Sequence, residues 1–448
     1  MALAGLAGCA GAPAPPSAQR LATGAVEGPP ARGAPVRPMP PPARANADIA
    51  RDILDLAFRL ESGRRLPVLT RFEAPITLRL TGRPTPRLAA DLDRLLARLR
   101  AEAGLDIRRV TAGRAAVTVE AVPRARIRRV LPQAACFVVP EVSSLSDYRA
   151  ARRRGGVTRW ADLARRTRVA VFVPMDTSPQ ETRDCLHEEL AQALGPLNDL
   201  YRLPDSVFND DNMHTVLTGF DMLVLRAHYA PELANGMSRA EVAARLPAIL
   251  ARLNPAGEAV APDPLPPTPA PWVEAIKTAL GPGARPAARR AAAARAVRIA
   301  EAEGWRDHRL AFAYFALGRV AQAGAPGEAR AAFRRADRIY AASTGTALHR
   351  AFVGAQLAAY ALADGDPDRV RAITAAHLPV AARHGNAMLE ATLLMLRAQA
   401  LEMQGRRAEA RAARLDSLDR ARYGFGSDGA VRAKLREIAA LDPSASGG

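Results

Sequence analysis

The chain has 448 residues, of which 49% are hydrophobic and 24% charged, so it is long enough for two or three domains with hydrophobic cores. Its formal net charge of +18 comes almost wholly from arginine, because Lys277 and Lys434 are the only lysines among 63 basic residues. Neither lysine follows a GxxxxG pattern, which excludes a Walker A nucleotide site, and no helix-turn-helix or zinc-finger pattern organises the arginines. The charge therefore favours attraction to anionic lipid or envelope polymer, and nucleic acid is not an expected partner.

Residues 1–9 end in LAGC, which resembles a bacterial lipobox whose cysteine, here Cys9, becomes lipidated. None of the residues before Cys9 is Arg or Lys, so we expect the basic and apolar parts of a signal peptide to be truncated. The alternative is a chance cysteine in an Ala/Gly-rich leader. No apolar run approaches the ~20 residues of a membrane-spanning helix, so attachment would be by lipid. The expected location is the periplasmic face of the bacterial cell envelope, with the outer membrane favoured because Ala10 rather than aspartate follows Cys9.

Residues 10–45 are dense in Pro, Ala and Gly without periodicity, which predicts a linker. Ordered structure is expected from residue 46 onward. The apolar spacing predicts helices over 48–63 and 85–104, and strands over 68–80, 115–122, 136–139 and 168–173. Further helices are predicted over 217–229 and 238–253, the second with a capping box from Ser238 to Glu241.

A helix predicted from Ser178 to Gly195 holds the most distinctive pattern in the chain. Glu188, Glu189 and Gln192 occupy positions i, i+1 and i+4, Gly195 follows at i+7, and Asn198 and Asp199 come next, with Asn198 at i+10. A helix places i and i+4 on one face, and a glycine after it lets the chain return a third side chain. The spacing therefore predicts a three-ligand site with a general base beside it.

This spacing resembles the metzincin zinc-peptidase signature H-E-x-x-H-x-x-G-x-x-H, with Glu188, Gln192 and Asn198 in the three histidine positions. In that resemblance Glu189 takes the place of the general base. A segment resembling the Met-turn follows at Ser206, Val207, Phe208 and Asn209, with Phe208 in the place of the methionine. The pattern EExxQxLGxxND…SVFND…LTxxDxxxLRxxY is also similar to a bacterial envelope family known as domain of unknown function 2927, over roughly residues 46–250. Both resemblances imply an α+β, zincin-like fold over 46–253.

The replaced ligands leave two interpretations of the site open. Zinc prefers imidazole and thiolate, whereas Gln and Asn amides are weak neutral ligands, and no frame of the helix restores two histidines. The leading interpretation is a zincin fold whose site has become a hydrogen-bonded polar cluster without a cofactor. The alternative is an oxygen-rich site in which Glu188, Gln192 and Asn198 or Asp199 hold a harder divalent metal, with Glu189 as the catalytic base.

The state of the two remaining cysteines, Cys136 and Cys185, depends on the cellular compartment of the protein. In an oxidising periplasm we expect them to form a disulfide, which would contribute about 4 kcal/mol in the chain-entropy model. In a cytoplasmic protein both would be buried thiols.

Residues 254–285 are rich in proline and lack apolar periodicity, which predicts a second linker and a domain boundary. An all-α region is predicted over 286–424, where Gly324, Gly365 and Gly405 stand 41 and 40 residues apart between Ala-rich helices. This repeat resembles tetratricopeptide-type helical repeats, which bind protein partners on a concave face. Plain antiparallel hairpins are the alternative. Residues 425–448 are expected to be a C-terminal tail.

Together these features predict a lipid-anchored envelope protein with a metzincin-like domain followed by a helical-repeat domain. The leading hypothesis for its function is a non-catalytic scaffold that holds protein partners. The alternative is a metallopeptidase-like hydrolase in which Glu189 activates water.

Overall fold

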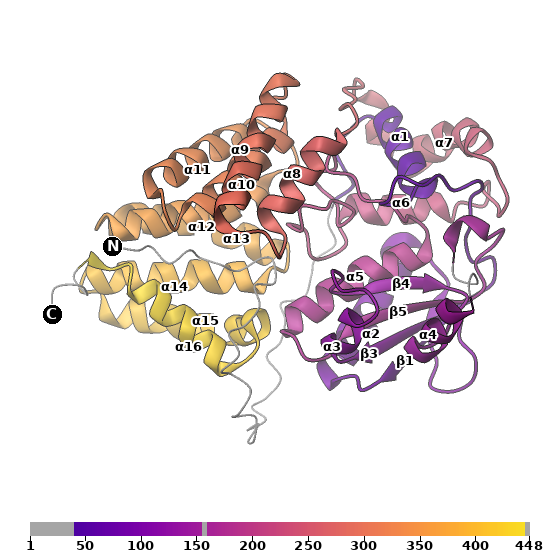
Figure 1. The fold of residues 1–448 in the computed structure, drawn as a ribbon, viewed down its shortest axis with the longest axis horizontal. Coiled ribbons are helices and arrows are strands. Elements are labelled where there is room, and N and C mark those ends of the chain that lie inside the picture. Colours follow the sequence, from indigo (N-terminus) through magenta and orange to yellow (C-terminus); the bar gives the residue numbers. More distant parts are fainter. Residues whose placement is uncertain (1–39, 155–158, 444–448) are drawn as a thin grey trace. The chain divides into compact units, whose positions relative to one another are not determined.

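The computed structural model describes residues 40–154 and 159–443, which form two compact units (Figure 1). The N-terminal unit holds residues 40–210 and 214–266, and the helical unit holds residues 267–443 together with Asp211–Met213. The lipobox-like segment 1–9, including Cys9, and nearly all of the linker predicted over 10–45 lie outside the described residues. Within the described part of the chain, no helix is long and apolar enough to cross a membrane.

The N-terminal unit is built on a five-stranded sheet in the order β2-β1-β3-β5-β4. Strands β1, β2, β3 and β5 are parallel, and the edge strand β4 pairs antiparallel with β5. Every residue of β5 is buried. A strand covered on both faces is expected to be one apolar run, and the sequence of β5 is VAVFVP. The strand bounds are β1 (Ile76–Gly82), β2 (Ile107–Arg109), β3 (Val117–Val122), β4 (Phe137–Pro140) and β5 (Val169–Pro174).

Helices pack around this sheet and on one another. Helix α5 contacts β4, β5 and α2, whereas α1 and α6 both contact α7. Helix α2 shows how the local sequence sets an element's limits: the Thr85 side chain caps its first turn, and Gly104 closes it at a φ of 68°. The helix bounds are α1 (Asn46–Ala57), α2 (Pro86–Ala103), α3 (Arg124–Arg128), α4 (Leu145–Arg153), α5 (Pro179–Leu194), α6 (Gly219–His228) and α7 (Arg239–Leu253), with short 3-10 turns at η1 (Trp160–Asp162) and η2 (Pro255–Ala259).

Three parts of the predicted elements differ from the structure. The helix predicted over 48–63 ends at Ala57, after which Arg59 and Arg65 form an isolated antiparallel β-bridge. The strand predicted over 68–80 begins only at Ile76, because the backbone before it pairs with another loop: Leu69 N–H donates to Met237 O and Leu69 O accepts from Gly236 N–H. The short elements β2, α3 and α4 were not predicted, since three to nine residues are too few to show a clear period.

The helical unit is a series of helices joined by short loops, each packed against the next in sequence. Gly324, Gly365 and Gly405 lie in the loops between α10 and α11, α12 and α13, and α14 and α15, which are the positions predicted for helix breaks. Gly365 and Gly405 have φ values of 73° and 69°, a conformation that favours glycine at a helix end. The bounds are α8 (Ala270–Leu280), α9 (Pro286–Ala302), α10 (His308–Ala321), α11 (Pro326–Ala341), α12 (Ala347–Ala363), α13 (Pro367–Arg383), α14 (Ala387–Met403), α15 (Arg407–Phe425) and α16 (Asp428–Ala439).

Both segments predicted to be unstructured at the ends of this unit contain a helix. The linker predicted over 254–285 includes α8, whose Trp272 is fully buried with its ring centroid 5.6 Å from that of Trp305. The tail predicted over 425–448 includes α16, which buries Val431 and Ile438. Helix α8 was not predicted because the prolines before it indicated a linker. Proline is tolerated in the first turn of a helix, and Pro271 stands there in α8.

Candidate functional site

Helix α5 carries Glu188, Glu189 and Gln192, the first residues of the ligand-like pattern that ends at Asn198 and Asp199. The sequence before the helix determines its first turn. The Ser178 hydroxyl accepts the backbone N–H of Glu181 at 3.2 Å, and Pro179 occupies the first turn, where its missing N–H costs nothing. Most side chains of α5 are buried because the helix packs against β4, β5 and α2. Polar side chains on α5 are therefore held in a largely dry environment.

A disulfide joins α5 to the edge of the sheet. Cys185 on α5 is bonded to Cys136, directly before β4, with the two Cα atoms 5.9 Å apart. This is the pair named from the sequence. The bond fixes α5 against the strand that borders it.

The C-terminal end of α5 is closed by a buried arginine that the sequence pattern did not reveal. Arg166 Nη1 donates to the carbonyls of Gln192 and Ala193, each at 2.7 Å, and Nη2 donates to the carbonyl of Gly195 at 2.5 Å. Burial lowers the pKa of Arg166 to about 10, which leaves the guanidinium charged at neutral pH. A cation at this end also complements the helix dipole. Arg166 thus fixes the direction in which the chain leaves α5.

Gly195 allows the chain to turn against a histidine ring. A Cβ atom built at Gly195 would lie 2.8 Å from Cδ2 of His228, closer than real Cβ contacts allow. The His228 ring is held in place by a 3.2 Å hydrogen bond between Nε2 and the Thr70 carbonyl, and burial lowers its pKa to about 3. His228 is therefore a neutral packing residue behind the turn, and Gly195 is required by close approach.

Replacing Gly195 by alanine is expected to destabilise the N-terminal unit by about 1–3 kcal/mol, because the added methyl group would displace the His228 ring. Urea unfolding followed by circular dichroism measures this loss. Gly327→Ala in α11 is the matched control, because no atom lies within 4 Å of its Cβ position, and there alanine should be neutral or slightly stabilising. Equal stability of Gly195→Ala and the unaltered chain would contradict the packing role.

An acidic cluster lies at α5. Glu188 and Glu189 come from α5, Asp199 from the segment after the turn, Glu61 from the loop after α1 and Asp210 from the loop before α6. Glu61 and Asp199 share a side-chain hydrogen bond. Neither Glu61 nor Asp210 was predicted as a site residue, since each stands in a loop without periodic signal.

Burial and the repulsion of acidic neighbours raise the pKa of three of these carboxyl groups, those of Glu188, Glu189 and Asp199. Burial raises the pKa of Glu188 to about 8, with added repulsion from Glu61 and Asp210. The pKa values of Glu189 and Asp199 lie well above their usual range, again first through burial and then through their acidic neighbours. These three groups therefore hold protons at neutral pH and can act as donors as well as acceptors of hydrogen bonds.

The two amide residues of the ligand-like pattern have different surroundings. Asn198 donates through Nδ2 to the backbone carbonyl of Asp55 at 3.0 Å, which ties the returning chain to α1. Gln192 is buried on α5, one turn after Glu188. Among the described residues, no three His, Cys, Asp or Glu side chains are arranged to hold a metal ion.

The Met-turn-like segment is bonded to α6 through one carboxylate. Asp221 accepts the Ser206 hydroxyl at 2.6 Å and the Val207 N–H at 3.2 Å, and it completes the capping box with Thr218 at the start of α6. Phe208 is fully buried, and Asn209 lies in the same turn, where Nδ2 donates to the Leu203 carbonyl at 2.7 Å. The segment thus packs as a rigid turn in the core of the unit.

The histidines nearest the pattern are occupied by backbone contacts. His187 Nδ1 accepts the N–H of Leu217 at 3.2 Å, and burial lowers the pKa of His187 well below its usual value. His214 Nε2 lies 3.0 Å from the Pro204 carbonyl. Both rings therefore serve to join loops in this structure.

Of three comparisons with known proteins, one gives a match, and it covers part of this chain. Neither the curated proteins nor the solved structures contain a match to it. Residues 46–248, which span the sheet, α5, the acidic cluster and the Met-turn-like segment, match a family model described as a protein of unknown function (DUF2927).

Proposed function

We propose that the chain is a cell-envelope protein that holds partner proteins without catalysing a reaction. In this proposal the N-terminal unit is metzincin-like but degenerate, and the helical unit is a tetratricopeptide-like array that binds partners. One observation carries the non-catalytic assignment: Gln192 and Asn198, in the second and third ligand positions, offer neutral amide oxygens, which are weak metal ligands. The Asn198 Nδ2 donates to the Asp55 carbonyl at 3.0 Å, which gives this side chain a structural contact with α1.

The zincin-like assignment is supported by the order of elements and by the turn after α5. Helix, strand, helix and further strands lead into α5, a glycine ends α5, and Asn198 follows in the returning chain. The tight turn at Phe208 follows and is bonded to α6. These are the parts that the resemblance implies, in the same order along the chain.

The donor set in the ligand-like positions does not fit zinc. It comprises one carboxyl group at Glu188 and two amides at Gln192 and Asn198, and zinc sites use imidazole, thiolate or carboxylate. Asn198 is bonded to Asp55 through Nδ2, so its oxygen, like that of Gln192, is a neutral amide donor and Glu188 is the one carboxyl group of the three. No reaction step through zinc is therefore derived for this site.

An exported location is supported by the Cys136–Cys185 bond, because disulfides persist mainly in oxidising compartments. Lipid attachment at Cys9 is part of the proposal and rests on the lipobox-like sequence. Arginine-rich composition is compatible with a position close to an anionic membrane surface.

The second candidate is a metallohydrolase that uses a harder divalent metal. The feature that favours it is chemical: Glu188, Asp199 and Glu61 are near enough to repel one another, and carboxylate oxygens suit such ions, although these three are not arranged as a metal site. In this alternative Glu189 would be the base that activates water.

Peptide hydrolysis by the full chain distinguishes the two candidates. We expect no hydrolysis of casein or fluorogenic peptides above background with added Zn²⁺, Mn²⁺ or Ca²⁺, and no difference between the unaltered chain and Glu189→Gln. Glu181→Gln, on the same helix but in a salt bridge with Arg124, is the control for a change of charge on α5. Metal-dependent hydrolysis that survives in Glu181→Gln and disappears in Glu189→Gln would contradict the proposal.

A further inference from the structure

One face of the sheet in the N-terminal unit is covered by the two short helices α3 and α4. Side chains alternate along a strand, so Ala170 and Phe172 of β5 point to one face and the valines of β5 to the other. Ala170 and Phe172 share a hydrophobic cluster with Ile127 of α3 and Leu145 of α4. Helix α5 packs on the valine side, where Leu186 joins the larger cluster. Helices α3 and α4 therefore form the outer layer on the side of the sheet away from α5.

This outer layer carries a concentration of arginines. Residues 124–154 contain eight arginines and only two acidic residues, Glu141 and Asp147. Arg124 forms a salt bridge with Glu181 at 3.0 Å. The other seven are exposed and, among the described residues, stand outside any ion pair; we call them the arginine surface: Arg126, Arg128, Arg129, Arg149, Arg152, Arg153 and Arg154.

Contacts between the two helices bring these arginines together. Arg152 Nη1 donates at 2.8 Å to the carbonyl of Val130, the residue that follows Arg129. On α4, Arg149 and Arg153 are one turn apart, so both project to the same side of that helix. The arginines at the end of α3 and those of α4 thus border one another on one surface.

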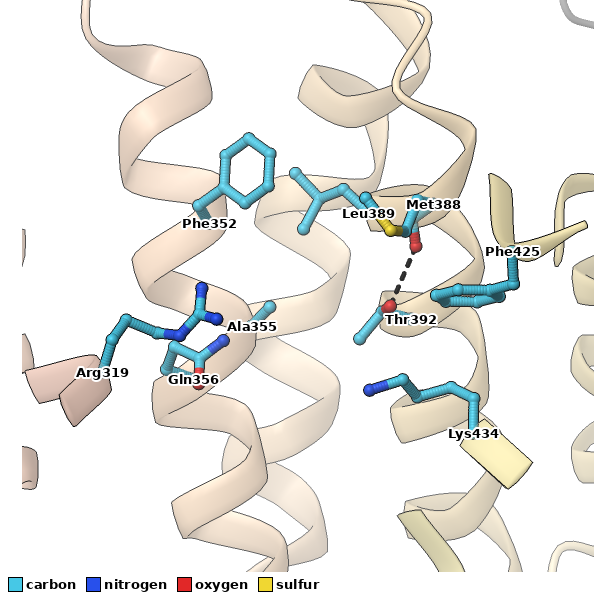
Figure 2. A pocket seen from close by; sticks show the side chains of 9 residues that line it. All are labelled: Arg319, Phe352, Ala355, Gln356, Met388, Leu389, Thr392, Phe425 and Lys434. Carbon is cyan, nitrogen blue, oxygen red and sulfur yellow. Dashed lines mark hydrogen bonds between the residues drawn. The ribbon is translucent and has the colours of Figure 1, made fainter. Parts of the chain in front are cut away.

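Several cations of the helical unit have a different environment. Arg350 and Arg414 each form a salt bridge, at 2.8 and 2.5 Å. Arg319 and Lys434 line a cavity of about 30 Å³ between helices of that unit (Figure 2), which is room for one or two water molecules. Lys434 is 7% exposed and pairs with Glu437 at 2.9 Å. These cations are paired or enclosed, whereas the arginine surface presents its charges to solvent.

Exposed guanidinium groups at this density attract a partner that carries many negative charges. Guanidinium groups bind phosphate oxygens in a bidentate manner, and their apolar stems can lie in a lipid headgroup layer. Apolar residues stand among them, because Val130 and Leu131 are half-buried in the turn after α3 and Pro132 beside them is exposed. No helix-turn-helix or zinc-finger pattern organises the arginines for nucleic acid. The combination favours a membrane surface with anionic headgroups.

We propose that the arginine surface binds the anionic headgroups of a phospholipid bilayer. The inference rests on the proposed cell-envelope location and names the face of the N-terminal unit that meets the membrane. The guanidinium groups pair with lipid phosphates, and Pro132 with the exposed parts of Val130 and Leu131 enters the headgroup layer. Helix α5 lies on the other side of the sheet, so its acidic cluster faces away from the negatively charged bilayer.

Sedimentation of the full chain with lipid vesicles tests this proposal. The chain carries Cys9→Ser, which prevents attachment through the lipobox-like segment, so that binding reports the folded surface. The vesicles consist of phosphatidylcholine, with or without phosphatidylglycerol. We expect binding to the vesicles that contain phosphatidylglycerol, weakening with added NaCl, and binding to pure phosphatidylcholine that is weaker by at least about tenfold.

Three double variants make the test specific. Arg149→Gln with Arg153→Gln removes two charges from the arginine surface and is expected to lower the affinity for the anionic vesicles on the order of tenfold. Lysine at the same two positions keeps the charge and should retain most of the binding. Arg114→Gln with Arg226→Gln is the matched control, because these exposed arginines lie in the loop before β3 and on α6. Its affinity should stay within about twofold of the unaltered surface. Thermal melting confirms that each variant is folded.

Three results would overturn the proposal. The first is equal sedimentation with neutral and anionic vesicles, or none with either. The second is a loss in the control pair as large as in the α4 pair, which would assign binding to the net charge of the whole chain. The third is binding of a DNA duplex through the same arginines without binding of the anionic vesicles, which would assign the surface to nucleic acid. Peptide hydrolysis and lipid on Cys9 are measured separately, so this inference and the proposed function can fail independently.

Discussion

Replacing Arg166 by methionine is expected to lower the free energy of unfolding of the N-terminal unit by roughly 3–5 kcal/mol. The guanidinium donates to three carbonyls at the end of α5 and to the Thr70 hydroxyl at 3.1 Å, and it lies 4.8 Å from the centroid of the Trp160 ring. Methionine retains part of the packing but leaves buried carbonyls without donors, each at a cost of about 1–3 kcal/mol. Urea denaturation of the full chain, followed by far-ultraviolet circular dichroism, measures the change.

Arg165→Met is the matched control, because Arg165 is the neighbouring residue and its side chain is exposed. Its effect should remain within about 0.5 kcal/mol, as for most surface substitutions. A similar small effect of Arg166→Met would show that the end of α5 does not depend on this cation. A larger loss with Arg165 than with Arg166 would contradict the assignment of the buried residue.

Replacing Glu188 by glutamine is expected to stabilise the N-terminal unit at alkaline pH and to leave its stability nearly unchanged at pH 5. The folded-state pKa of Glu188 is raised to about 8 by burial and by acidic neighbours, whereas in the unfolded chain it is the ordinary 4.5. Between these values the unfolded chain has released the proton and the folded chain keeps it, so rising pH favours unfolding. Glutamine removes this contribution, which the two pKa values place at about 4 kcal/mol by pH 8.

The measurement is the unfolding free energy of both proteins at several pH values from about 5 to 9. The difference between them removes the contribution of the buried histidines and reports Glu188 together with its repulsion of Glu189 and Asp199. Glu181→Gln serves as a control on the same helix, because its carboxylate pairs with Arg124 at 3.0 Å at a more exposed position. A difference that does not grow with pH would contradict protonation of the cluster. Destabilisation by Glu188→Gln would indicate that the carboxylate binds a cation.

The elements with strong local signals were predicted from the sequence. Helix α2 has a capping threonine, a closing glycine and leucines one turn apart, and α5 has the same kind of start at Ser178 and Pro179. Gly365 and Gly405 marked helix ends because the left-handed conformation they adopt favours glycine. Helix α8 was missed because its apolar residues follow a run of prolines.

The candidate site was predictable only where its residues are neighbours in sequence. Spacing along one helix placed Glu188, Glu189 and Gln192 near one another, because one turn separates i from i+4. Arg166 and Glu61 come from other elements and carry no periodic pattern, so only the folded chain brings them to α5. The bond from Asn198 to the Asp55 carbonyl likewise depends on tertiary packing. The sequence therefore indicated a ligand-like geometry, whereas the contacts that favour a structural role became visible only in three dimensions.

The central claim is that the cluster on α5 is a protonated polar site and not a metal centre. Elemental mass spectrometry of the full chain, purified without chelators, tests this most directly, with Glu188→Ala and Gln192→Ala measured in parallel. We expect no stoichiometric divalent metal in any of the three proteins. About one equivalent of metal in the unaltered chain, lost in both variants, would contradict the claim and favour the metallohydrolase.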